Sequence, residues 1–190
     1  MKKILVLLVS VLWACQLHAG TITVTADDSF TGFTINGVSY LSSLGSASDL
    51  NDWRTTSSFN FDFLPGTTYE LVWSIADLYH VAMGFIGAVD VGNGQIYKSG
   101  IGNEGWSFTS ASPTALYNTT NGLAPWHNTV NSGLLAGANW VGYTSANHFE
   151  KFDTMTATLK FTTPVPLPAA AWMLGAGLVA LVGVRRRMNR

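Results

Sequence analysis

The sequence contains almost no cysteine and little charge. Cys15 is the single cysteine among 190 residues, which excludes an intramolecular disulfide and the zinc and iron–sulfur sites that need several thiolates. Charged residues make up 11% of the chain, less than half of the roughly 25% typical of soluble domains. Disorder of the charged kind is excluded too, because aromatic residues make up 12% and supply material for a core.

The few charges are distributed unevenly along the chain. Six of the ten basic residues lie at positions 2, 3, 185–187 and 190, whereas all eleven acidic residues lie between these ends. Residues 20–164 therefore carry four basic and eleven acidic side chains, a net charge of −7. Because an acidic surface repels a phosphate backbone, this balance excludes nucleic acid as a partner.

The N-terminal end has the pattern of a secretory signal peptide. Two lysines precede an apolar run over residues 4–14, which is shorter than the about 20 residues of a membrane-spanning helix. Ala19 supplies a small residue for signal peptidase, so we predict that the mature chain begins at Gly20. Two alternatives stay open: lipidation of Cys15, whose preceding residues loosely resemble a lipobox, and a signal anchor that is not cleaved.

The C-terminal end contains the longest apolar run of the sequence. Residues 165–184 hold no charged side chain, and about 20 residues of α-helix span about 30 Å, the thickness of a bilayer core. The run is followed directly by Arg185, Arg186 and Arg187. Because basic residues stay on the cytoplasmic side, we predict one transmembrane helix that leaves the acidic stretch outside the membrane.

A short motif opens this apolar run. It consists of Val165, Pro166, Leu167, Pro168 and Ala169. Together with the apolar helix and the arginines, it resembles the VPLPA variant of the PEP-CTERM protein-sorting signal. The resemblance implies recognition by an exosortase, a polytopic membrane transpeptidase that cuts near the motif in bacteria that also make exopolysaccharide. The alternative is an ordinary membrane anchor preceded by a proline-rich linker.

Proline gives the motif a physical rationale. Its ring geometry is incompatible with a helix interior, and it biases the preceding residue toward extended backbone. We therefore expect a protease to meet an extended segment at the membrane surface. The sorting signal is predicted to occupy residues 164–190, and the signal peptide residues 1–19.

Between the two ends the apolar pattern is that of β-strands. Strict alternation predicts strands over residues 21–25, 59–63, 69–75 and 155–161. Asn36-Gly37, a pair typical of two-residue turns, predicts a hairpin, and a second hairpin is predicted around the glycines of residues 90–95. A helical turn is predicted only within residues 46–53. Strands at this spacing predict an all-β fold, a β-sandwich or jelly roll, over residues 20–163.

Three tryptophans in polar surroundings are candidates for ligand contact. Trp106 follows a polar stretch, and Trp126 and Trp140 lie within residues 110–150, a segment rich in Ser, Thr, Asn and Gly that predicts long loops with short strands. Exposed aromatic rings on a β-sandwich suit stacking on sugars, so these three predict a glycan-binding platform. The alternative is that the rings cover the core beneath the loops.

Metal binding is predicted weakly by the sequence. Asp90 and Asn93 place oxygen ligands on a turn, as calcium prefers, and Asp27 and Asp28 form a similar pair. The alternative is that these side chains bond their own backbone, and we favour it. The three histidines that follow the predicted signal peptide have no metal-ligand spacing; they are His80, His127 and His148. Calcium is thus the one possible cofactor.

Catalytic patterns are missing from the sequence. It has no Gly-x-Ser-x-Gly pattern for a serine nucleophile. Paired carboxylates for glycoside hydrolysis would have to include Glu70, Glu104 or Glu150, whose separations a sequence does not give. We therefore predict that the chain is not an enzyme.

The patterns predict an exported protein held by a single C-terminal helix, and the resemblance to the sorting signal implies a bacterial protein of the cell surface or extracellular matrix that an exosortase processes. The mature domain is expected to be a glycan-binding or structural module with extracellular polysaccharide as its partner. The alternative is a surface-anchored hydrolase that acts on polysaccharide.

Overall fold

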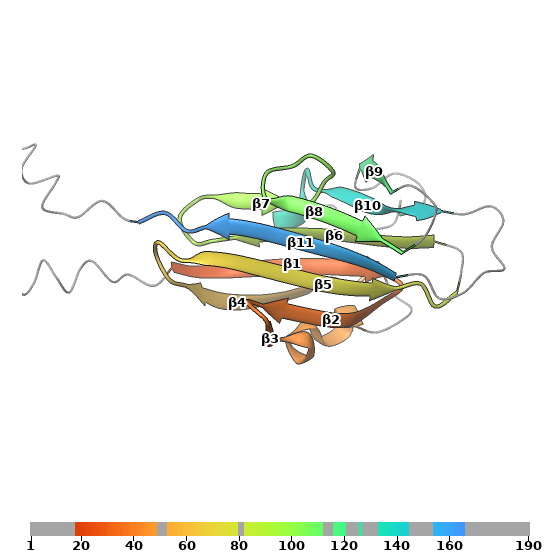
Figure 1. Ribbon diagram of the computed structural model, residues 1–190, viewed down its shortest axis with the longest axis horizontal. Helices are drawn as coiled ribbons and strands as arrows, with labels where there is room; N and C mark the ends of the chain where they lie inside the picture. The colour runs from red at the N-terminus through yellow and green to blue at the C-terminus, as the bar shows by residue number, and fades with distance from the viewer. Residues whose placement is uncertain are drawn as a thin grey trace, which may run out of the picture.

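The structure is a computed structural model that describes residues 18–48, 53–79, 82–111, 116–120, 126, 133–144 and 154–165. These residues form eleven β-strands and two short 3₁₀-helices. All strand pairs are antiparallel and belong to two sheets, which face each other in a sandwich-like arrangement (Figure 1). The prediction of an all-β fold is confirmed.

The first sheet contains the N-terminal strand, β1, which lies between two other strands. Its strands follow the spatial order β4 (Ser57–Phe63), β1 (His18–Asp27), β6 (Ala82–Asp90), β10 (Asn139–Thr144) and β9 (Tyr117–Thr120). A further short strand, β7 (Ile96–Lys98), pairs with β6.

The second sheet contains the C-terminal strand, which lies between two other strands. Its strands follow the order β3 (Val38–Ser39), β2 (Ser29–Ile35), β5 (Thr68–Ala76), β11 (Thr154–Thr162) and β8 (Trp106–Ser110). The 3₁₀-helices are η1 (Leu41–Ser48) and η2 (Gly133–Leu135). The helical turn predicted within residues 46–53 thus begins earlier, at Leu41.

Alternation explains why the predicted strands form. In β11 the apolar residues Met155, Ala157, Leu159 and Phe161 are buried, and Lys160 between the last two is exposed. Such period-two burial is what a strand needs to place one face on a core. The strands predicted over residues 21–25, 59–63, 69–75 and 155–161 all lie within observed strands.

Both predicted hairpins are also confirmed. Asn36 and Gly37 have positive φ angles of 48° and 79°, as a two-residue turn between twisted strands requires, and they connect β2 to β3. The second hairpin connects β6 to β7 through Gly92 and Gly94, whose φ angles are 78° and 86°.

Aromatic rings from both sheets form the core between them. Trp73 of β5 is fully buried and stacks on Phe33 of the same sheet at a centroid distance of 5.0 Å. It also contacts Phe85 of the opposite sheet at 5.3 Å. A second, smaller cluster lies on the other face of β6 and includes Ile86, Ala88 and Trp140. Because both faces of β6 are covered, this strand is buried along nearly its whole length.

Four aromatic rings join several elements at one end of the sandwich. We call Phe63, Tyr69, Tyr97 and Phe161 the exit cluster, because β11 ends beside it. Phe161 contacts the other three rings at centroid distances of 5.4, 5.8 and 4.8 Å. Phe63 also pairs with His18 at the start of β1. The beginning of β1 and the end of β11 therefore lie at the same end of the fold (Figure 1).

Most of the predicted signal peptide and sorting signal lies outside the described residues. This applies to residues 1–17 and 166–190. Within the part that the structure describes, no helix has the length and apolar character needed to cross a membrane.

The contact between β10 and β6 leads to a prediction about stability. A Cβ atom on Gly142 would lie 2.0 Å from the backbone oxygen of Met83, an overlap that only a backbone shift removes. We expect Gly142→Ala to lower the free energy of unfolding by about 1–3 kcal/mol, measured by urea unfolding. The control is Gly32→Ala, whose Cβ would approach only the Ser74 side chain, at 3.3 Å. Equal losses in both variants would contradict the prediction.

Candidate functional site

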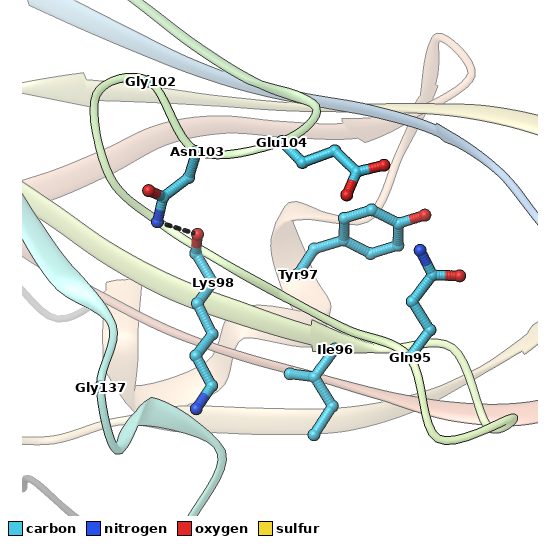
Figure 2. A pocket seen from close by; sticks show the side chains of 8 residues that line it. All are labelled: Gln95, Ile96, Tyr97, Lys98, Gly102, Asn103, Glu104 and Gly137. Atoms are coloured by element: carbon cyan, nitrogen blue, oxygen red, sulfur yellow. Dashed lines mark hydrogen bonds between the residues drawn. The ribbon is translucent and has the colours of Figure 1, made fainter.

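A polar hollow lies between β7 and the loop that leads to β8. Its volume is about 480 Å³, within the range of about 300–1,000 Å³ for small-molecule sites. Figure 2 shows the side chains around it, which come from the β6–β7 turn, from β7 and from the following loop. The lining residues are Gln95, Ile96, Tyr97, Lys98, Gly102, Asn103, Glu104 and Gly137.

Tyr97 connects the hollow to the core. Its ring is buried and stacks on Phe161 at a centroid distance of 4.8 Å, while its hydroxyl points into the hollow (Figure 2). Burial raises the pKa of Tyr97 above its usual value of 10, and the negative charge of Glu104 raises it further. The hydroxyl is therefore neutral at physiological pH, able both to donate and to accept a hydrogen bond.

Gln95 and Glu104 place two more polar groups beside this hydroxyl. In Figure 2 the Gln95 amide and the Glu104 carboxylate point to the same side of the hollow as the Tyr97 hydroxyl. Among the described residues, none of these three side chains has a hydrogen-bond partner. The hollow therefore presents polar groups that are open to solvent and that a ligand can bond in place of water.

Internal hydrogen bonds hold the walls of the hollow in place. The Asn103 amide donates to the backbone oxygens of Lys98 and Ser99 at 2.9 and 3.2 Å, the first of which is drawn in Figure 2. The Lys98 ammonium donates to the backbone oxygen of Ala136. The Ser99 hydroxyl donates to the backbone oxygen of Asn139 at 2.7 Å. The loop is thus tied to β7 and to the segment before β10.

The three tryptophans predicted as a glycan-binding platform lie in the interior. Trp106 is 7% exposed, Trp126 1% and Trp140 0%. Trp106 stacks on Trp73 at 5.6 Å, and Trp126 stacks on Trp140 at 4.8 Å. None of the three is an exposed stacking surface, and their burial matches the alternative that they cover the core.

The predicted calcium ligands bond their own turn. A carboxylate oxygen of Asp90 accepts the N–H of Gly92 at 2.8 Å, and the side-chain oxygen of Asn93 accepts the N–H of Gln95 at 2.9 Å. These are the local bonds of turn-forming side chains. Over the described stretches of the chain, no group of three or more His, Cys, Asp or Glu is arranged to hold a metal ion.

The other candidate groups are separated or lie outside the described residues. Glu70 is exposed on β5, in the second sheet, whereas Glu104 lines the hollow. The remaining candidates fall on residues that the structure does not describe; they are His80, His127, His148 and Glu150.

The predicted sorting motif begins two residues after Thr163, which directly follows the last residue of β11. Thr163 is 1% exposed; its backbone pairs with Gly66 and Thr67 at 3.0 Å, and its hydroxyl donates to the backbone oxygen of Leu64. Two residues later, Val165 is 69% exposed. The rest of the motif, Pro166, Leu167, Pro168 and Ala169, and the arginines Arg185, Arg186 and Arg187 lie outside the described residues.

The predicted signal-peptide cleavage site lies at the start of β1. This strand begins at His18, and Ala19 and Gly20 pair with Asp62 and Phe61 of β4. Cleavage before Gly20 would remove the pairs that His18 and Ala19 form with β4 and would retain the pairs from Gly20 onward. A Cβ on Gly20 would lie 2.3 Å from the Asp90 backbone oxygen, so only glycine fits at this position.

Sequence reasoning missed a buried carboxyl at the opposite end of β1. Asp27 is 9% exposed and accepts a hydrogen bond of 2.7 Å from the indole N–H of Trp126. Burial raises the pKa of Asp27 to about 8, with the neighbouring Asp28 and Asp77 acting in the same direction and the Trp126 bond against it. The one signal in the sequence is an acidic pair that directly follows an alternating apolar strand.

Comparisons with known proteins give no relative for this chain. No family model, no curated protein and no solved structure matches it.

The raised pKa of Asp27 predicts an unusual dependence of stability on pH. Between about pH 4 and about pH 8 the unfolded chain loses this proton while the folded chain keeps it, so the free energy of unfolding falls as pH rises. We expect Asp27→Asn, which can still accept the Trp126 bond, to remove this dependence by stabilising the protein at the upper end of the range. Urea unfolding at both ends of this pH range measures the change in the free energy of unfolding.

Asp62→Asn, at an exposed site on β4, is the control and should leave the dependence of the free energy of unfolding on pH unchanged. A slope that survives in Asp27→Asn would contradict the assignment.

The charge of Glu104 predicts a measurable effect on Tyr97. Because this charge raises the pKa of the hydroxyl, we expect Glu104→Gln to lower the pKa of Tyr97, with burial keeping it above its usual value. Titration of the tyrosine ring carbons by NMR measures the change. Glu70→Gln is the matched control, and an unchanged Tyr97 pKa in Glu104→Gln would show that the two groups do not interact.

Proposed function

We propose that this chain is an exported surface protein that an exosortase-type transpeptidase processes at its C-terminal sorting signal. The observation that carries the proposal is the change from burial to exposure at the residue where the motif begins. Thr163 is buried and bonded to the turn at Leu64–Thr67, and Val165 is 69% exposed. A transpeptidase that requires an accessible peptide would therefore meet the first residue of the motif without unfolding the domain.

The arrangement of the strands supports the same function. The start of β1 and the end of β11 lie at one end of the fold, joined through Phe63 and Phe161. In the proposal both connect to membrane-directed segments, the signal peptide before β1 and the sorting helix after β11. A domain with both connections at one end can stand on the outer face of a membrane without its chain passing around it.

For the mature domain we propose a polysaccharide-binding or structural module of the cell surface or extracellular matrix. The hollow beside β7 supports binding because it gathers polar groups that have no partner among the described residues. It does not favour the hydrolase. Glycoside hydrolysis uses two carboxyl groups about 5–10 Å apart, and of the residues that the structure describes, Glu104 alone brings a carboxyl group to the hollow.

The sorting proposal predicts a defined mass for the mature protein. We expect the wild-type protein recovered from cells and medium to begin at Gly20 and to lack the apolar helix and the arginines that follow it. In the double variant Pro166→Ala/Pro168→Ala, the motif gains access to helical backbone, so we expect it to keep the tail. Intact-mass spectrometry of both proteins makes the comparison.

The neighbouring proline provides a matched control. Pro164 is exposed and lies outside the five-residue motif, so Pro164→Ala should be processed like the wild type. A tail retained in all three proteins would identify the segment as a plain membrane anchor and overturn the proposal.

A further inference from the structure

We propose that the hollow beside β7 is a binding site for a neutral saccharide, with Gln95, Tyr97 and Glu104 as its hydrogen-bonding residues. The proposal deepens the function proposed above, since it names a site and a ligand class for the polysaccharide-binding module. It also corrects the location expected from the sequence, because the three tryptophans that suggested a sugar platform are buried.

The chemistry of the three side chains suits sugar hydroxyl groups. A carboxylate accepts hydrogen bonds, an amide donates and accepts, and a neutral tyrosine hydroxyl does both. Adjacent hydroxyl groups of a pyranose present the same mixture of donors and acceptors. Because the three groups have no partner among the described residues and open into one hollow (Figure 2), a polyol can bond them without displacing an internal contact.

The site is held in place before a ligand arrives. The Tyr97 ring is fixed by stacking on Phe161, and the loop that carries Glu104 is tied to β7 by the two bonds of the Asn103 amide. Binding therefore requires little ordering of the Tyr97 ring and of the loop backbone, whereas the side chains of Gln95 and Glu104 become ordered when the ligand bonds them.

The rim of the hollow adds an apolar surface. Ile96 lies on β7 and is 42% exposed, and it lines the hollow next to Tyr97. Figure 2 shows the Ile96 side chain on the opposite side of β7 from the Tyr97 hydroxyl and the Gln95 amide, as alternation along a strand requires. Ile96 therefore bounds the hollow away from the three polar groups, which are left as the ligand-bonding part of the site.

Charge selects a neutral ligand over an acidic one. Among the described lining residues, Glu104 is the one acidic side chain and Lys98 the one cation, and Lys98 is already bonded to the backbone oxygen of Ala136. The chain between residues 20 and 164 carries a net charge of −7. Uronate or sulfate groups would therefore meet repulsion both in the hollow and from the domain as a whole.

Calorimetric titration of the full chain with defined oligosaccharides tests this site. The protein is purified in lauryldimethylamine oxide, a detergent with no sugar headgroup. The probes are cellopentaose, maltopentaose and laminaripentaose as neutral sugars and pentagalacturonate as the acidic one. We expect at least one neutral probe to bind and pentagalacturonate to bind at least about tenfold more weakly.

Three substitutions in the hollow test whether the sugar binds there. We expect Tyr97→Phe, which keeps the stacked ring, and Gln95→Ala each to lower the affinity for the probe by about 3–10-fold. We expect Glu104→Gln to lower this affinity by about tenfold or more. Glu70→Gln, an exposed glutamate of the second sheet, should bind like the wild type. Thermal unfolding of each variant shows whether a loss of binding comes from an unfolded domain. If Tyr97→Phe unfolds, Gln95→Ala provides the test, because Gln95 lies on a turn outside the core.

Different results overturn different parts of the account. Binding that is unchanged in all three variants would place the sugar elsewhere on the domain and overturn the site while leaving the module intact. No binding of any neutral probe, or tighter binding of pentagalacturonate, would overturn the ligand class. Failure of the sorting proposal appears separately, in the mass of the processed protein, because these titrations do not depend on processing.

Discussion

The contact between Phe161 and the other three rings of the exit cluster supports both regions that we connect with function. Phe161 packs on Phe63 and Tyr69 near the end of β11, and Thr163, two residues later, is hydrogen-bonded to the turn at Leu64–Thr67. The same ring stacks on Tyr97 and thereby aims its hydroxyl into the hollow. Loss of this ring would therefore loosen the chain exit and the candidate sugar site together.

Much of the fold was predictable because alternation is a local property of the sequence. The Thr and Lys residues of β11 alternate with apolar ones, and a strand is the conformation that separates such residues onto two faces. The Asn36-Gly37 turn was predictable for the same reason, since these residue types tolerate the positive φ angles that the turn requires. Neither inference depended on knowing which strands become neighbours.

The order of strands and the burial of the tryptophans depend on long-range contacts that a sequence pattern does not report. Trp126 stands among polar residues in the sequence, yet it packs against Trp140 and bonds Asp27, 99 positions earlier. The hollow has a similar origin. Its residues come from a turn, a three-residue strand and a loop, and only the attachment of β7 to the edge of β6 brings them together.

The central claim is that the end of β11 stands outside the cytoplasmic membrane with the sorting motif exposed beside it. Cysteine labelling tests this directly, because Cys15 is the single native cysteine. The same chain without the introduced cysteine is the control for any labelling of Cys15. Val165→Cys is introduced into the Pro166→Ala/Pro168→Ala chain, and spheroplasts are treated with a membrane-impermeant maleimide. The account predicts labelling of Cys at this position before the membrane is permeabilised. Labelling that appears only after permeabilisation would place the domain inside and contradict the account.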